Sequence, residues 1–69
     1  MKYYEVLLRI MLGTRVIGRQ SVSLRARSPF RAAIEAESML ETAFGQEAYC
    51  IAFKVTRITK DEYSMLAVA

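Results

Sequence analysis

The sequence predicts a small α+β domain in which one helix packs against one face of an antiparallel sheet. Two segments with a period of two meet at Gly13-Thr14, and glycine supplies the positive φ that a tight hairpin turn needs. Ser28-Pro29 then introduces a long alanine-spaced segment, as expected at the start of a helix. A third strand-like segment follows. The order is therefore β-β-α-β in a single two-layer domain over residues 1–69, with three strands, or four if the last segment also pairs.

The first strand is expected over about 3–12, because aromatic and β-branched residues alternate there. One face of this strand is apolar and the other is mixed. The apolar face holds Tyr4, Val6, Leu8, Ile10 and Leu12, and the mixed face holds Tyr3, Glu5, Leu7, Arg9 and Met11.

The second strand is expected over about 15–26. Its even positions Val16, Val22, Leu24 and Ala26 suit a core, whereas its odd positions are basic or hydroxylated. A two-residue turn would place the odd positions beside the apolar face of the first strand. A three-residue turn over 13–15 would correct the register, and so would a β-bulge at Gly18-Arg19. We favour the bulge, because it also buries Ile17.

The helix is expected over about 29–44, with Gly45 as its C-terminal cap. Helical spacing groups one apolar face, consisting of Ala33, Ala36, Leu40, Ala43 and Phe44. Phe30 and Ile34 lie at one margin of this face and Met39 at the other. The alanines allow the helix axis to approach the sheet closely.

A third strand is expected over about 48–58. Tyr49, Ile51, Phe53 and Val55 share one side, and Cys50, Ala52, Lys54 and Thr56 share the other, which we expect to be open. Residues 59–62 resemble a turn. Residues 63–68 are expected to form a short fourth strand or a loosely docked tail.

Charge is segregated along the chain. Residues 1–31 hold seven basic side chains and one acid, and residues 32–53 hold four acids and no base. Because the first part is predicted to form strands and the second a helix, the fold should have a basic side and an acidic side. This arrangement predicts recognition of a partner by surface charge.

Catalytic and metal chemistry find little support in the composition. The chain has no histidine, which excludes Ser-His and Cys-His pairs and leaves a poor set of metal ligands. Cys50 is the only cysteine, so no internal disulfide can form, and a lone thiol fits a reducing compartment. Glu37 and Glu41 resemble a solvated helix rim. We expect a cytoplasmic protein without catalytic residues, metal or cofactor, and no apolar stretch reaches the length that spans a bilayer.

The strand arginines are the best candidate site. Phosphates or acidic protein surfaces could be bound by Arg9, Arg19, Arg25, Arg27, Lys54 and Arg57. The alternative interpretation is that these cations cover an exposed sheet face and discourage edge pairing. Tyr3, Leu7 and Met11 should form an apolar interface on the same face. Tyr3 is also the one aromatic ring expected there, whereas proteins that stack nucleic-acid bases use two or three rings. A core this thin also predicts a homodimer through the open face or an edge strand.

Four features of the chain occur together: the β-β-α-β order, the strand end Ser21-Val22-Ser23-Leu24-Arg25-Ala26, Ser28-Pro29, and the helix alanines Ala32, Ala33 and Ala36. In this layout the chain resembles short phage-encoded proteins. Some anti-CRISPR proteins share this layout, and the resemblance implies a single domain that binds a host defence complex. The strand-strand-helix part also resembles that of HicB-type antitoxins. Neither resemblance assigns a role to a residue.

Two functions are therefore expected. The first is a non-enzymatic protein that occludes a host protein or complex with an acidic surface. The second is a small basic nucleic-acid-binding protein that binds single-stranded or double-stranded DNA. If the basic strand is not the site, the acidic helix surface of Glu35, Glu37 and Glu41 becomes the next candidate.

Overall fold

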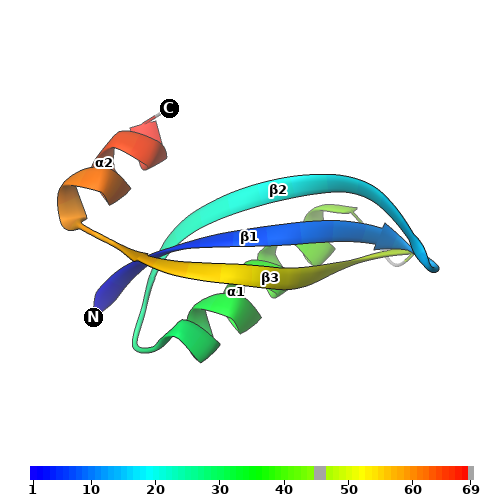
Figure 1. Cartoon of the computed structure of the whole chain (residues 1–69), viewed down its shortest axis with the longest axis horizontal. Coiled ribbons are helices and arrows are strands. Elements are labelled where there is room, and N and C mark those ends of the chain that lie inside the picture. The colour runs from blue at the N-terminus through cyan, green and yellow to red at the C-terminus, as the bar shows by residue number, and fades with distance from the viewer. Residues whose placement is uncertain (45–46, 69) are drawn as a thin grey trace.

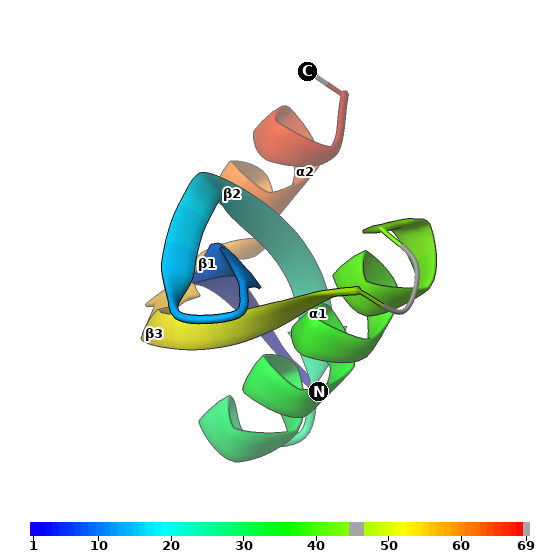
Figure 2. The same cartoon turned by 90° about the vertical axis from the view of Figure 1, so that its right-hand side faces the viewer.

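The computed structural model describes residues 1–44 and 47–68, and the side chains of residues 1–42 and 47–66. The elements are β1 (Lys2–Leu12), β2 (Arg15–Ala26), α1 (Pro29–Phe44), β3 (Ala48–Ile58) and α2 (Lys60–Val68). Within the described residues, the three strands form an antiparallel sheet in the order β2-β1-β3. Helix α1 lies against one face of this sheet (Figures 1 and 2). The predicted α+β layout is confirmed.

The β1–β2 hairpin has a two-residue turn and a bulge. Leu12 pairs with Arg15 across Gly13, whose φ is 61°. Ile10 pairs with Gly18 and Met11 with Val16, so Ile17 has no partner in the ladder. The bulge therefore lies just before the expected position.

The expected burial of Ile17 is wrong. As the extra residue of the bulge, Ile17 has no directly opposite neighbour, and 51% of it is exposed. Val16 is also not a core residue, because it precedes the bulge and shares a face with Met11. After the bulge, Val22, Leu24 and Ala26 face α1 as predicted.

A second bulge in β3 was not expected. Leu7 pairs with Lys54 and Leu8 with Ala52, so Phe53 is left out of the ladder. Cys50 and Ala52 consequently face α1, and their expected position on the open face is wrong. Tyr49 and Ile51 take that position instead, while Val55 still faces α1 opposite Val6.

The core lies between α1 and the even positions of β1. Leu8 and Val6 are its largest fully buried side chains. The buried hydrophobic residues are Tyr4, Val6, Leu8, Ile10, Leu24, Ala26, Ala32, Ala36, Leu40 and Cys50. This compact set agrees with the thin core predicted for a chain of 69 residues.

Helix α1 begins as predicted. Ser28 is its N-cap, because its Oγ accepts the backbone N–H of Arg31 at 3.2 Å, and Pro29 is the first helical residue. The buried face is centred on Ala32, Ala36 and Leu40, so it is rotated away from the expected centre, and Ala33 is only half-buried.

The margins of the predicted helix face are largely exposed. Phe30 is 74% exposed, Met39 56% and Ile34 39%. The expected cap at Gly45 and the expected core contacts of the Ala43 and Phe44 side chains lie outside the part of the chain that the structure describes.

The C-terminal segment forms a helix, so the possible fourth strand over 63–68 and the turn over 59–62 are wrong. Glu62 N–H donates to Thr59 Oγ1, and Thr59 N–H donates to a Glu62 carboxylate oxygen, each at 3.1 Å. These reciprocal bonds are a capping box, which satisfies backbone donors that the start of a helix leaves unpaired. Helix α2 stands at the end of the sheet where β3 finishes (Figure 1).

Candidate functional site

The candidate site is the open sheet face, which we define as the face turned away from α1. Strand register assigns the residues that share it, because side chains alternate between faces and change alternation at each bulge. They are Tyr3, Glu5, Leu7, Arg9, Met11, Val16, Arg19, Ser21, Ser23, Arg25, Tyr49, Ile51, Lys54, Thr56 and Ile58. Phe53 joins them, because the Arg9 guanidinium carbon lies 4.6 Å from its ring centre.

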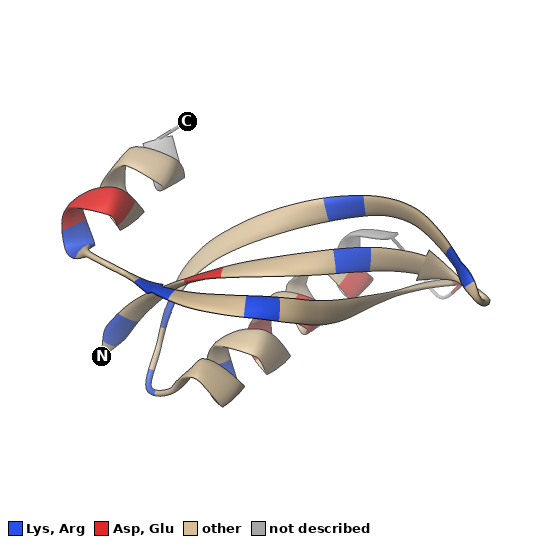
Figure 3. Cartoon of the chain, in the orientation of Figure 1, with Lys and Arg blue, Asp and Glu red and all other residues tan. Residues whose placement is uncertain are grey.

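Arg9 and Arg19 form the basic centre of this face. They are directly opposite each other in the β1–β2 ladder, where like charges are destabilising. Lys54 lies on the neighbouring strand β3, opposite Leu7. Figure 3 shows basic positions on all three strands of the sheet and several acidic positions on α1 behind it. An anionic partner on the open face would relieve the repulsion between the two arginines.

The acids of the described residues leave this centre unneutralised. The ion pair described joins Arg31 to Glu35 at 3.7 Å, both on α1. Glu5 shares the open face, but its direct cross-strand neighbours are Ser23 and Thr56. The basic potential of the face is therefore available to a partner.

Aromatic rings are more numerous on the open face than the sequence predicts. The Tyr49 hydroxyl donates to the Gly13 carbonyl at 2.6 Å, which holds its ring beside the hairpin turn. Tyr49 is 40% exposed and Phe53 42%. At the other end of the sheet, the rings of Tyr3 and Tyr63 lie 4.8 Å apart. Rings therefore flank the basic centre on both sides.

The predicted binding residues divide between two sides of the sheet. Arg9, Arg19, Arg25 and Lys54 share the open face, as expected. Arg57 is opposite Tyr4, so register places it toward the α1 side. The remaining residue, Arg27, lies after the end of β2, in the connection to α1. Four of the six predicted cations are thus brought together.

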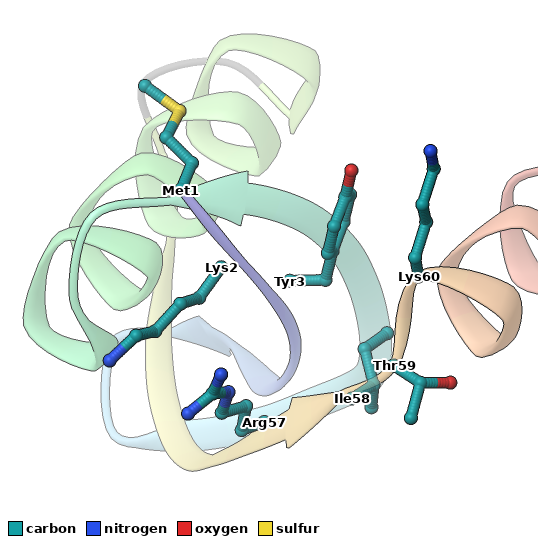
Figure 4. Close-up of a pocket in the computed structure, with 7 residues that line it drawn as sticks. All are labelled: Met1, Lys2, Tyr3, Arg57, Ile58, Thr59 and Lys60. Carbon is teal, nitrogen blue, oxygen red and sulfur yellow. The ribbon is translucent and has the colours of Figure 1, made fainter.

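A pocket of about 450 Å³ lies where β1 starts and β3 ends. Lys2, Arg57 and Lys60 contribute three cations to its lining. Figure 4 shows Lys2 and Arg57 extending to one side of the strands and Tyr3 and Lys60 to the other. Because the charged groups diverge, this pocket does not form a single anion site.

The residues of the predicted apolar interface share the open face, and other apolar residues join them there. Tyr3, Leu7 and Met11 are half-buried on the open face. Val16 and Ile51, which the sequence placed toward the core, add exposed aliphatic surface there. Their position follows from the two bulges. A glycine signalled the first, whereas no glycine or proline marks the second at Phe53.

On the α1 side of the sheet, the polar and thiol side chains have structural roles. Glu37 on α1 accepts the backbone N–H of Ala52 at 2.9 Å, so this carboxylate binds the backbone of β3 and is not part of a fully solvated helix rim. Burial raises the pKa of the Cys50 thiol, and the charges of Glu41 and Glu37 raise it further. Both effects disfavour the thiolate, and Cys50 therefore serves as a small core side chain.

Across residues 1–44 and 47–68, no group of three or more His, Cys, Asp or Glu residues is placed to hold a metal ion. None of the helices in this part of the chain has the length and apolar character needed to cross a membrane. Comparison with protein-family models, curated proteins and solved structures finds no match to this chain.

Proposed function

We propose that this protein is a non-enzymatic binding protein that occludes an acidic surface of a host protein or complex with its open sheet face. The observation that carries the proposal is the direct pairing of Arg9 with Arg19 beside Lys54, with no ion pair to these cations among the side chains that the structure describes. Placing like charges opposite each other costs the free protein stability. A partner that supplies carboxylates offsets that cost when it binds.

The aliphatic residues of the open face favour a protein as the partner. Leu7 and Met11 lie in the rows on either side of Arg9, and Ile51 pairs directly with Arg9. A phosphate group would bury none of this apolar surface. A protein surface would remove them from water while its carboxylates meet the cations. Arg, Tyr, Phe and Met are also the side chains enriched at the centres of protein interfaces.

Single-stranded nucleic acid is the second candidate partner, and the exposed rings support it. Tyr49 and Phe53 lie on the same face as Arg9 and Arg19. Single-strand binders combine stacking rings with a basic track in this way. The single-ring objection raised from the sequence therefore no longer holds.

A pair of matched double variants tests the proposal. Arg9→Glu with Arg19→Glu reverses two charges on the open face, whereas Arg15→Glu with Arg57→Glu reverses two charges that register places on the α1 side. We expect the first variant to lose a partner captured from host lysate and the second to retain it. Equal capture by both variants would refute the open face as the site.

Nuclease treatment and salt separate the two partner classes. A protein partner should be captured equally with and without nuclease. If the partner is nucleic acid, capture should disappear with nuclease, and anisotropy with a labelled single-stranded oligonucleotide should show a steep salt dependence. Each reversed arginine that contacts a phosphate should then reduce the slope of log K against log salt by about one.

A further inference from the structure

The two edges of the sheet are covered differently. At β3, Glu37 from α1 bonds the backbone of Ala52. The side-chain hydrogen bonds described for residues 1–42 and 47–66 reach the backbone of β3, the hairpin turn and the helices, and none reaches β2. Strand β2 therefore presents an edge that another strand can join.

A groove of about 540 Å³ follows this edge. Its lining comes from both faces of the sheet, with Leu24 and Met39 on the α1 side and Tyr3 and Tyr63 on the open side. Ser23 and Arg25 of β2 also line it, on the open side. A space bounded from both faces of a sheet lies at the edge of that sheet. Figure 2 shows α1 and α2 on either side of β2. We call this space the β2 groove.

The charge around the β2 groove is basic. A second hollow of about 480 Å³ shares Arg25 with it and adds Arg27 and Arg31. Glu35 is the acid in that lining, and it already pairs with Arg31 at 3.7 Å. A second copy of β2 would bring only further arginines to this edge, because β2 carries three arginines and no acid. An acidic strand is electrostatically complementary.

We propose that an extended acidic segment of the partner protein binds in the β2 groove as a fourth strand beside Ser23–Arg25. This inference rests on the proposed function, since it specifies how the same acidic partner is held. Backbone hydrogen bonds to β2 would supply affinity, as in other cases of strand addition. Met39 and the Tyr3–Tyr63 pair would contact alternate side chains of the added strand, and Arg25 and Arg27 would meet its carboxylates.

The probe for this site is a capped peptide of alternating glutamate and valine, about six residues long, a typical strand length. In NMR titrations of the full chain, we expect the largest amide shifts at residues 21–26 and at Met39. The same peptide with N-methyl groups on alternate amides should bind about tenfold more weakly, because it lacks strand donors. Equal affinity of the two peptides, no binding of either, or shifts centred on Arg9 and Phe53 would each overturn the proposal.

Variants separate this inference from the proposed function. Met39→Glu adds an acid at the groove from the α1 side of the sheet, opposite to the side that holds Arg9 and Arg19, and Phe30→Glu makes the same kind of change elsewhere on α1. We expect Met39→Glu to reduce capture of the native partner about tenfold and Phe30→Glu to leave it unchanged.

If only Arg9→Glu with Arg19→Glu abolishes capture, the open face stands and the β2 groove is refuted. If the double variant also captures normally, both proposals fall. A stable dimer formed through β2 would refute the acidic segment as the occupant.

Discussion

At the scale of single residues, the small size of the core makes each large buried side chain important. Leu40 is 9% exposed and packs with Ala36 and the strand residues, while its neighbour Met39 is 56% exposed. We predict that Leu40→Ala lowers the free energy of unfolding by about 2–4 kcal/mol, because it removes buried volume. Met39→Ala is the matched control and should cost less than about 1 kcal/mol. Thermal melts that shift equally in both variants would contradict this account of the core.

Cys50 makes the stability of the protein depend on pH in the alkaline range. Burial raises the pKa of this thiol in the folded protein, so the folded state holds the proton at a pH where the unfolded chain releases it. The stability that the protonated Cys50 thiol contributes is fully present below the thiol pKa of the unfolded chain, about 8.5. It is lost as the pH rises through the higher pKa of the folded protein. We predict that Cys50→Ala flattens the decline of unfolding free energy above about pH 8.5. Parallel declines in the two proteins, measured by urea unfolding, would refute it.

At the scale of elements, the start of α1 and the turn between β1 and β2 follow from local signals, whereas the sheet register does not. Ser28-Pro29 specifies the start of α1, and the hairpin at Gly13 fixes where β1 and β2 meet. The bulge at Phe53 changes every face assignment before it in β3, and alternation alone fits either register. In the structure the small side chains of Cys50 and Ala52 lie opposite Ile10 and Leu8 on the α1 side, and the larger Tyr49 and Ile51 take the open face.

The start of helix α2 carries a capping-box signal that also fits a turn. Thr59 and Glu62 have the spacing of a capping box, but the polar residues between them also resemble a turn. We predict that Thr59→Ala weakens α2 by about 1 kcal/mol, so that the Tyr63 amide, which bonds the Thr59 carbonyl at 2.9 Å, exchanges about fivefold faster. Ser64→Ala removes a hydroxyl from the same helix without removing the cap, and it should leave that exchange rate nearly unchanged. Equal acceleration in both variants would contradict the role of the cap.

At the scale of the whole molecule, α1 covers one face of the sheet and leaves the other with both cations and apolar side chains. The two kinds of side chain favour different surfaces on whatever molecule covers the face. Leu7, Met11 and Ile51 favour any apolar surface, including that of a second copy, whereas Arg9 and Arg19 favour only an acidic one. Self-association and partner binding therefore compete for the same residues, and salt should shift the balance between them.

We predict that a homodimer formed through the open sheet face becomes more stable as the salt concentration rises. Facing copies would bring Arg9, Arg19 and Lys54 close to the same cations of the second copy. Screening this repulsion should make the dimer tighter as salt rises from about 0.05 to 0.5 M, whereas binding of an acidic partner should weaken. Arg9→Glu should strengthen the dimer, because the new carboxylate attracts the cations of the facing copy. It should weaken binding of the acidic partner, because the same carboxylate repels the partner's acids. Sedimentation that gives the monomer mass of 7.9 kDa at every salt concentration would exclude the dimer and leave the open face to the partner alone.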